Sequence, residues 1–403
     1  MRDGFVRLFL AFARLTHPSI GCGRRRHTRI LFKGVAQDPL SGPAALPRAR
    51  GRKATRPRKS RKAGERALRY SIALPGYIHS GGRLRSPGII AVPSERDFEM
   101  GEVARAVLAN VVHKLKTVKV GHRITDSGLV KWICGEGLAI ADLRYGAQAL
   151  VFVDDYVGRA MYVWGEHDPR ITGVLDAVLS PGDTVLDIGA NLGTVALFAC
   201  KKVGTDGRVH CFEPQPVVAQ CLRTSMMING FTQGIVHECG LSSQSGSAEM
   251  AILQAGNLGT ATLVSASEPT GAPTIQVRME NAGEFIRALD CRRLSLIKID
   301  VEGHEEVVLG AMRDWMREAK PNIVLFECFV GKDGFWSENV VGLLAGLGYE
   351  FLSYDLENYW KTQLHRVGKD VMHPQGHDFV AYLPGGLQGQ AAQRLESLIR
   401  ALR

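Results

Sequence analysis

Residues 184–193 read TVLDIGANLG, and this stretch decides the fold of the chain. Its apolar first half is typical of a buried strand, and its second half is a glycine-containing turn. Residues 194–199, TVALFA, then begin an apolar pattern of helical type. Glycine turns between a strand and a helix let a ligand approach the backbone, because no side chain shields it. A nucleotide-like cofactor is the first candidate for such a turn.

The same succession of strand and helix continues on both sides of this turn. We expect strands at 184–188, 208–212, 235–239, 294–299, 322–327, 349–354 and 378–383, and helices at 171–179, 194–202, 216–229, 282–289, 304–317 and 340–347. Between 241 and 279, short β-rich pieces separated by Ser, Gly and Thr predict small hairpins. Alternation at this spacing predicts an α/β fold with a parallel sheet and helices on both faces.

The positive charge of the chain is concentrated at its N-terminus. Residues 1–70 hold 19 Lys and Arg against Asp3, Asp38 and Glu65, so a net charge of +10 leaves −6 for the remaining 333 residues. Residues 24–26 and 48–62 are dense in charge, Pro and Gly and poor in large apolar residues, and we expect a disordered basic tail over residues 1–90. A basic arm for nucleic acid or anionic lipid, an unstructured extension, and a start assigned ahead of Met100 are the alternatives.

Order is expected to begin near Ser94, before the α/β alternation. Apolar residues between 103 and 115 recur at helical spacing. The runs 149–153 and 160–164 are interpreted as two strands of a hairpin, joined by a polar turn.

Composition favours a cytoplasmic protein with reduced thiols. No C-x-x-C pair occurs among the eight cysteines, so buried thiols are favoured over zinc ligation. No run approaches the roughly 20 apolar residues of a membrane span. Residues 5–15 could form an amphipathic helix at a membrane surface, but two arginines interrupt them too early for a signal peptide.

Acidic residues end three of the expected strands: Asp187, Glu213 and Asp300. Ligands of open α/β sheets bind beyond the carboxyl ends of the strands, near the point where the strand order reverses. If these strands are neighbours, the three carboxylates line one rim of a binding site.

The glycine turn itself argues against a dinucleotide. A dinucleotide fingerprint needs G-x-G-x-x-G, but Asn191 stands where the middle glycine would admit a pyrophosphate. Glu213 follows the second strand, where a carboxylate accepts hydrogen bonds from a ribose diol. A nucleoside without a diphosphate, such as S-adenosylmethionine, suits this pattern, and an acidic rim suits its cationic groups.

Residues 297–305 read IKIDVEGHE, and with LDIGANLG at 186–193 and FEP at 212–214 they make the chain resemble the FkbM family of class I S-adenosylmethionine-dependent methyltransferases. The resemblance covers roughly residues 160–385, and residues 297–305 are its most specific string. Its other strings are GLSSQSG at 240–246 and NLGT at 257–260. It implies a doubly wound, mostly parallel, seven-stranded Rossmann-like sheet with an antiparallel last strand. We expect the tail over 1–90, a lead-in of helix and hairpin over 94–170, the methyltransferase domain over 171–385 and a C-terminal helix over 386–403.

The resemblance also implies the residues of a cofactor site. Glu213 would bind the ribose hydroxyls of S-adenosylmethionine, the backbone around Leu241 and Ser242 would pass beside the adenine, and Glu166 would help to close the site. The family implies a hydroxyl oxygen of a sugar or secondary metabolite as acceptor. The remaining expected cofactor-binding residues are Asp187, Gly189, Ala190, Asn191, Gly193 and Pro214.

A hydroxyl acceptor benefits from a base that receives its proton. Asp300, Glu302 and His304 are the candidates, and His304 has the most suitable unperturbed pKa. Capping of the following helix is the competing interpretation of Glu302 and His304. No metal is assigned, although the same acids could instead bind a divalent cation.

Two other enzyme classes and one non-enzyme remain as alternatives. An NAD-dependent dehydrogenase would need a glycine at position 191. A nucleic-acid methyltransferase would use the basic tail, although the rest of the chain is net acidic, so no nucleic-acid partner is expected there. A catalytically dead assembly module is disfavoured by the complete acidic rim. The expected partner is a small hydroxylated acceptor, while its identity and the oligomeric state are not readable. Arg144, Arg159 and Lys298 could contact an anionic group, but we expect them to be exposed, solvated charges.

Overall fold

The computed structural model describes residues 125–252, 261–263, 273–289, 291, 294–357 and 359–400. The expected basic tail, the helix over 103–115 and the NLGT string at 257–260 lie outside these residues.

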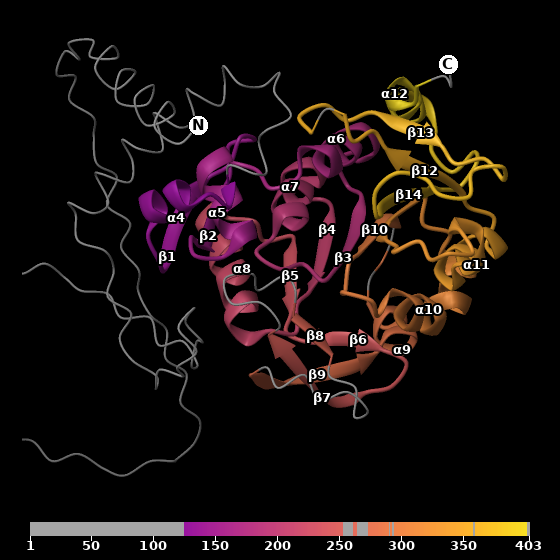
Figure 1. Cartoon of the computed structure of the whole chain (residues 1–403). Helices are drawn as coiled ribbons and strands as arrows, with labels where there is room; N and C mark the ends of the chain where they lie inside the picture. Colours follow the sequence, from indigo (N-terminus) through magenta and orange to yellow (C-terminus); the bar gives the residue numbers. More distant parts are fainter. Residues whose placement is uncertain are drawn as a thin grey trace, which may run out of the picture. The chain divides into compact units, whose positions relative to one another are not determined.

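A mixed sheet of eight strands organises the described part of the chain (Figure 1). Its order is β13-β12-β14-β11-β10-β3-β4-β5. The strands are β3 (Thr184–Ile188), β4 (Arg208–Phe212), β5 (Gly234–His237), β10 (Leu294–Ile299), β11 (Ile323–Glu327), β12 (Glu350–Tyr354), β13 (Leu364–Arg366) and β14 (Asp378–Tyr382). The five strands from β11 to β5 are parallel, and β14 pairs antiparallel with both β11 and β12, as expected.

The expected number of seven strands is wrong, because β13 adds an eighth at the edge. This strand pairs antiparallel with β12. Three residues are too few to show an alternation of apolar and polar side chains, so the sequence pattern does not reveal it.

Helices cover both faces of the sheet, as predicted. Neighbouring residues of β3 belong to different hydrophobic clusters, one on each face of the sheet. Val185 packs with the helices of one face, which are α6 (Pro169–Val178), α7 (Thr194–Val203) and α8 (Pro216–Asn229). Leu186 packs with the helices of the other face, which are α9 (Ala282–Arg287), α10 (Glu305–Ala319) and α11 (Asn339–Gly346). Side chains of a strand alternate between its two faces, so a sheet buried on both sides needs apolar residues at every position.

The hairpin expected at 149–164 is wrong in its second half. A hairpin does form, but from β1 (Leu138–Asp142) and β2 (Gln148–Phe152). The run 160–164 belongs to helix α5 (Tyr156–Trp164), whose N-cap Asp155 accepts a 2.9 Å hydrogen bond from the backbone N–H of Gly158. Seven residues of α5 are buried, and an apolar run as short as 160–164 does not distinguish a buried strand from part of a buried helix.

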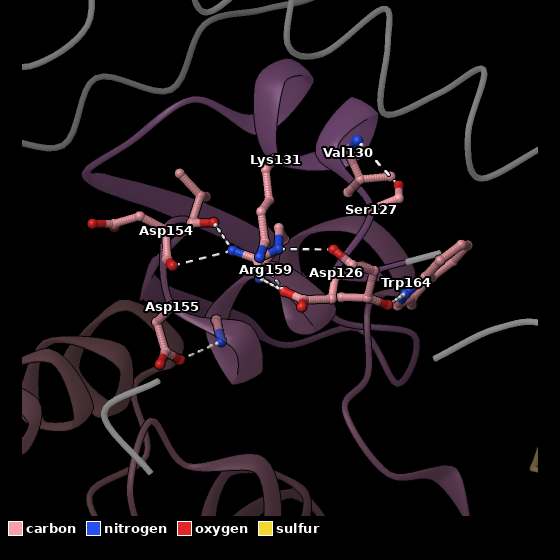
Figure 2. A network of polar contacts seen from close by, with 11 residues as sticks. Asp126, Ser127, Val130, Lys131, Asp154, Asp155, Arg159 and Trp164 are labelled. Atoms are coloured by element: carbon pink, nitrogen blue, oxygen red, sulfur yellow. Dashed lines mark hydrogen bonds and ion pairs between the residues drawn. The ribbon is translucent and has the colours of Figure 1, made fainter. Parts of the chain in front are cut away.

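Arg159 on α5 is a buried arginine rather than a solvated charge, which corrects the expectation (Figure 2). Its guanidinium donates to the carbonyl oxygens of Thr125, Val153 and Asp154 at 2.9–3.1 Å and pairs with Asp126 at 2.9 Å. These bonds connect α5 to the residues that precede α4 (Gly128–Cys134) and to the turn that follows β2.

A second sheet forms within the region where hairpins were predicted. Its order is β6-β9-β7-β8, and its strands are β6 (Gly240–Ser242), β7 (Gly246–Ile252), β8 (Ala261–Leu263) and β9 (Thr274–Asn281). After α10 and β11 the chain forms the short 3-10 helix η2 (Phe335–Ser337). Within the expected C-terminal helix lies α12 (Gly389–Leu398), from which Arg394 donates a 2.8 Å bond to Ala177 on α6.

None of the helices in the described ranges combines the length and the apolar character needed to cross a bilayer. The described cysteines are free thiols, and five of these seven are buried.

Candidate functional site

A cavity of about 370 Å³ opens at the carboxyl ends of the parallel strands. Within the sheet, β3 has β4 as its neighbour on one side and β10 on the other. The strand order therefore reverses between β3 and β10. This is the position at which open α/β sheets bind their ligands. Residues of the glycine turn, the β10–α10 loop and the second sheet line the cavity, and the expected site residues among them are Gly189, Asn191, Glu213, Pro214, Leu241, Asp300, Glu302 and His304.

The glycine turn is held against β4 by its backbone. The N–H groups of Gly189 and Ala190 both donate to the carbonyl oxygen of Phe212 at 3.0 Å. Gly189 has a φ of +78°, and a Cβ placed on it would lie 1.9 Å from the carbonyl oxygen of Asp300. A side chain there would therefore clash with the backbone after β10. The turn can take this path only with glycine at position 189.

Glu213 presents a fixed carboxylate to the cavity. Its Oε2 accepts a 3.0 Å hydrogen bond from the backbone N–H of Asn191, and its Oε1 accepts a 2.8 Å bond from that of Gln215. Burial raises the pKa of Glu213 to about 7, although both hydrogen bonds act in the opposite direction. Each oxygen retains a lone pair that can accept a further hydroxyl donor.

Asp187 lies behind the cavity rather than on its wall. Its side chain is fully buried and pairs with the ammonium of Lys298, 3.7 Å from Oδ1. Burial raises the pKa of Asp187. Lys298 is itself buried, which corrects its expected place among the solvated charges, and it also donates a 2.7 Å bond to the carbonyl oxygen of Gly189. The expected rim of three strand-end carboxylates thus consists of two on the wall, Glu213 and Asp300, with Asp187 beneath them.

The loop between β10 and α10 brings the three candidate bases together on the cavity wall. Asp300 pairs with Lys298 at 3.4 Å. Glu302 takes a left-handed backbone conformation with φ +54°, and burial and Asp300 raise its pKa to about 7. His304 is the N-cap residue of α10 without a side-chain capping bond, so the capping interpretation does not hold for it. Its Nε2 lies 3.0 Å from the hydroxyl of Ser242, and burial lowers its pKa.

The other expected cofactor residues stand next to the cavity without lining it. Ala190 is buried in the core, and Gly193 is the N-cap residue of α7. Ser242 contacts His304 as described. Glu166 accepts a hydrogen bond from the hydroxyl of Thr172, which does line the cavity. Burial raises the pKa of Glu166. Arg144, expected as a solvated charge, lies over the ring of Trp360 at 5.0 Å.

Several wall residues escaped the sequence interpretation. Tyr156 lies on α5, within the expected hairpin, whereas His167 and Asp168 precede α6 and Arg170 lies in its first turn. Glu327 and Asp378 also line the cavity. Glu327 ends an expected strand in the same way as Asp187, Glu213 and Asp300, so the strand-end rule would have found it.

The carboxylates at this wall form a close group. Oxygens of Asp300, Glu305 and Glu327 lie within 4.8 Å of one another, a separation that a divalent cation could bridge. Acidic groups of this kind are common without an ion, so the grouping by itself assigns no metal.

Comparison with known proteins shows which sequences this part of the chain is similar to. Residues 187–351 match the model of the methyltransferase FkbM domain. The chain is 28% identical over 223 residues to 31-O-demethyl-FK506 methyltransferase FkbM of Streptomyces tacrolimicus, a match that covers 47% of this chain and 81% of that protein. It is 26% identical to methyltransferase sdnD of Sordaria araneosa, over 35% of this chain and 64% of that protein.

Among solved structures, the chain is similar to methyltransferase FkbM from Methylobacillus flagellatus KT. The TM-score is 0.31 at 16% identity, and the match covers 56% of this chain and 53% of the other.

Proposed function

Residues 187–351 of this chain belong to the FkbM methyltransferase family, and on that premise we propose that the protein transfers a methyl group from S-adenosylmethionine to a hydroxyl oxygen of a small molecule. The observation that supports this proposal most is the position of Glu213. Its carboxylate lies beside the glycine turn at the end of β4 and is fixed by two backbone N–H groups. A ribose diol can donate to both oxygens, so this end of the cavity suits a nucleoside.

The chemistry of the donor explains the rest of the lining. When bound, S-adenosylmethionine supplies a methyl group on a positively charged sulfur, which leaves as a neutral thioether. Asp300 and Glu302 give the opposite wall of the cavity the negative charge that suits a cation. Gly189 and Asn191 of the turn after β3 line the cavity as well, and β3 lies between β4, which precedes Glu213, and β10, which precedes Asp300.

The acceptor would enter along the remaining walls of the cavity. Tyr156, His167 and Arg170 line it from α5 and α6, and Met250 and Met279 line it from the second sheet. Alignment of the hydroxyl oxygen with the methyl group supplies much of the rate in such displacements. His304, Asp300 and Glu302 lie on the wall from which a base can take the hydroxyl proton.

Binding measurements with full-length protein test this proposal. We expect calorimetry to detect S-adenosylhomocysteine and to detect no NAD. Binding of NAD without S-adenosylhomocysteine would instead support a dehydrogenase.

A screen of hydroxylated sugars and metabolites with methyl-labelled S-adenosylmethionine would then identify the acceptor. Asp187→Ala serves as the negative control, because it removes the partner of Lys298 beneath the turn. Transfer of label to RNA or DNA, but to no small molecule, would contradict the proposed acceptor class.

A further inference from the structure

Five carboxylates meet where β10, β11 and β14 reach the cavity. Glu327 ends β11 and lies directly opposite Asp378, the first residue of β14, in the antiparallel register. Opposite residues of such a pair have Cβ atoms about 5 Å apart. Asp300, Glu302 and Glu305 approach from the β10–α10 loop, and oxygens of Asp300 and Glu305 lie within 4.8 Å of Glu327. Strand geometry therefore fixes Glu327 in the middle of the group.

The neighbours of Glu327 are already engaged in other contacts. Glu305 accepts hydrogen bonds from the backbone N–H groups of Val301 and Gly303 at 2.8 and 3.4 Å. Asp300 pairs with Lys298 at 3.4 Å, and Asp378 lies 3.6 Å from the guanidinium of Arg170. By contrast, no residue within the described ranges donates a hydrogen bond to the Glu327 carboxylate or pairs with it.

The group cannot ionise fully at neutral pH. Burial first, and then the negative charges of Asp300, Glu302, Asp378 and Glu305, raise the pKa of Glu327 to about 8. The cations nearby, Lys298 and Arg170, are each committed to other carboxylates. A carboxylate that exchanges its proton near neutral pH, on the wall of a cavity, has the properties of a general base.

We propose that Glu327 receives the proton of the acceptor hydroxyl during methyl transfer. This inference rests on the function proposed above. In the step, the hydroxyl oxygen forms a bond to the methyl carbon, and the carbon–sulfur bond breaks with its electron pair going to sulfur. The hydroxyl proton passes to the Glu327 carboxylate.

The geometry favours Glu327 over the bases expected from the sequence. Nε2 of His304 is hydrogen bonded to Ser242, and Asp300 is held by the Lys298 ammonium. Glu302 stands in a loop with a left-handed backbone, whereas Glu327 ends a strand that is paired on both sides.

The test compares full-length Glu327→Gln with wild type and with Glu350→Gln. Glu350 is an exposed glutamate at the opposite end of the same sheet, on β12, and its substitution should leave activity unchanged. Affinity for S-adenosylhomocysteine is measured first, and we expect all three proteins to agree within about twofold. If wild type does not bind S-adenosylhomocysteine, the proposed function itself fails.

Methyl transfer from labelled S-adenosylmethionine is then followed from pH 5.5 to 9, with the acceptor that the screen identifies for wild type. Wild-type kcat should rise with pH through an apparent pKa near 8. In Glu327→Gln, kcat should be about 10²- to 10⁴-fold lower and should no longer increase with pH. Glu327→Asp should recover part of kcat and part of its pH dependence. In a carbon-13 NMR titration of the glutamate carboxyls, the chemical shift of one resonance should change with a midpoint near pH 8. This resonance should be missing from Glu327→Gln.

Three results would overturn the inference. The first is an unchanged pH profile in Glu327→Gln. The second is loss of the profile in His304→Gln instead. The third is loss of activity with a chelator and recovery with Mg²⁺, because the acids would then be metal ligands.

Discussion

The ammonium of Lys298 lies 3.7 Å from Oδ1 of Asp187, and both side chains are buried beneath the glycine turn. The same ammonium donates to the carbonyl oxygen of Gly189, so one cation links β10 to the end of β3 and to the turn that follows it. Neither carboxylate oxygen of Asp187 accepts a hydrogen bond of ordinary geometry from a described residue, so the Lys298 ammonium is its main charged neighbour. The pair therefore supports the floor of the cavity.

Removing one charge of this pair should lower the free energy of unfolding more than removing both charges. Lys298→Met leaves a buried carboxylate without its cation, and we expect it to lower the free energy of unfolding by about 3–5 kcal/mol. Lys298→Met combined with Asp187→Asn removes both charges of the pair. Part of the lost free energy of unfolding should therefore be recovered. Urea denaturation of wild type, both single variants and the double variant measures the coupling. Additive losses would show that the two residues do not interact.

Gly189→Ala should disrupt the turn beyond the cost of its backbone conformation. Gly230 has a left-handed backbone with a similar φ of +66°, but no atom lies within 4 Å of the position that its Cβ would take, so Gly230→Ala is a matched control. Both variants should lose about 1–2 kcal/mol from the left-handed conformation. Gly189→Ala should lose about 1–3 kcal/mol more, because its Cβ meets the carbonyl oxygen of Asp300. Equal unfolding free energies, from urea denaturation, would contradict this contact.

Binding of S-adenosylhomocysteine should depend on the ionisation of Glu213. The pKa of Glu213 is raised to about 7, and ribose hydroxyls donate best to the ionised form. Affinity should therefore fall as the pH is lowered from 8 to 5.5. Glu213→Gln should bind about 10- to 100-fold more weakly at pH 8 and show little pH dependence. Glu238→Gln, a change at a more exposed glutamate paired with Arg223, should retain the wild-type pH dependence in calorimetry.

Raised pKa values also predict how stability changes with pH. The folded-state pKa values of Glu213 and Glu327 lie near 7 and 8, above their ordinary value of 4.5. Their contribution to the free energy of unfolding is therefore largest below about pH 4.5, and it is lost as the pH rises through 7 to 8. Thermal denaturation without ligand should show a smaller fall in Tm between pH 5.5 and 8.5 for Glu327→Gln than for wild type. An equal fall would mean that Glu327 titrates normally.

Arg159→Met should destabilise the protein without changing the affinity of the site. Three carbonyl oxygens would lose their donor, and each unsatisfied buried acceptor costs about 1–3 kcal/mol (Figure 2). Arg159→Lys should restore only part of this, because an ammonium cannot reproduce the planar fork of the guanidinium. Urea denaturation reports the loss, and calorimetry with S-adenosylhomocysteine reports the site. A large change in affinity at full stability would assign Arg159 to the site instead.

Much of the parallel sheet and of the glycine turn was predictable from the sequence alone. Strands buried on both faces are continuous apolar runs, and the turns between them are marked by glycine and proline, so local composition identifies both. The same reasoning located Glu213 and Asp300, because a strand end in a parallel sheet fixes where a carboxylate emerges. It failed for α5, since the short apolar run 160–164 fits a buried strand as well as part of a buried helix.

Only the tertiary structure decided which charges are buried and which of them meet. Lys298 and Arg159 resemble solvated cations in the sequence, yet each is buried among partners that lie on other elements. Glu327 and Asp378 are about fifty residues apart in the chain, and they become neighbours only because β14 inserts antiparallel beside β11. The sequence determines the elements, since their patterns are local. Pairing between distant elements determines the electrostatics of the cavity, because charge interactions depend on distances in space.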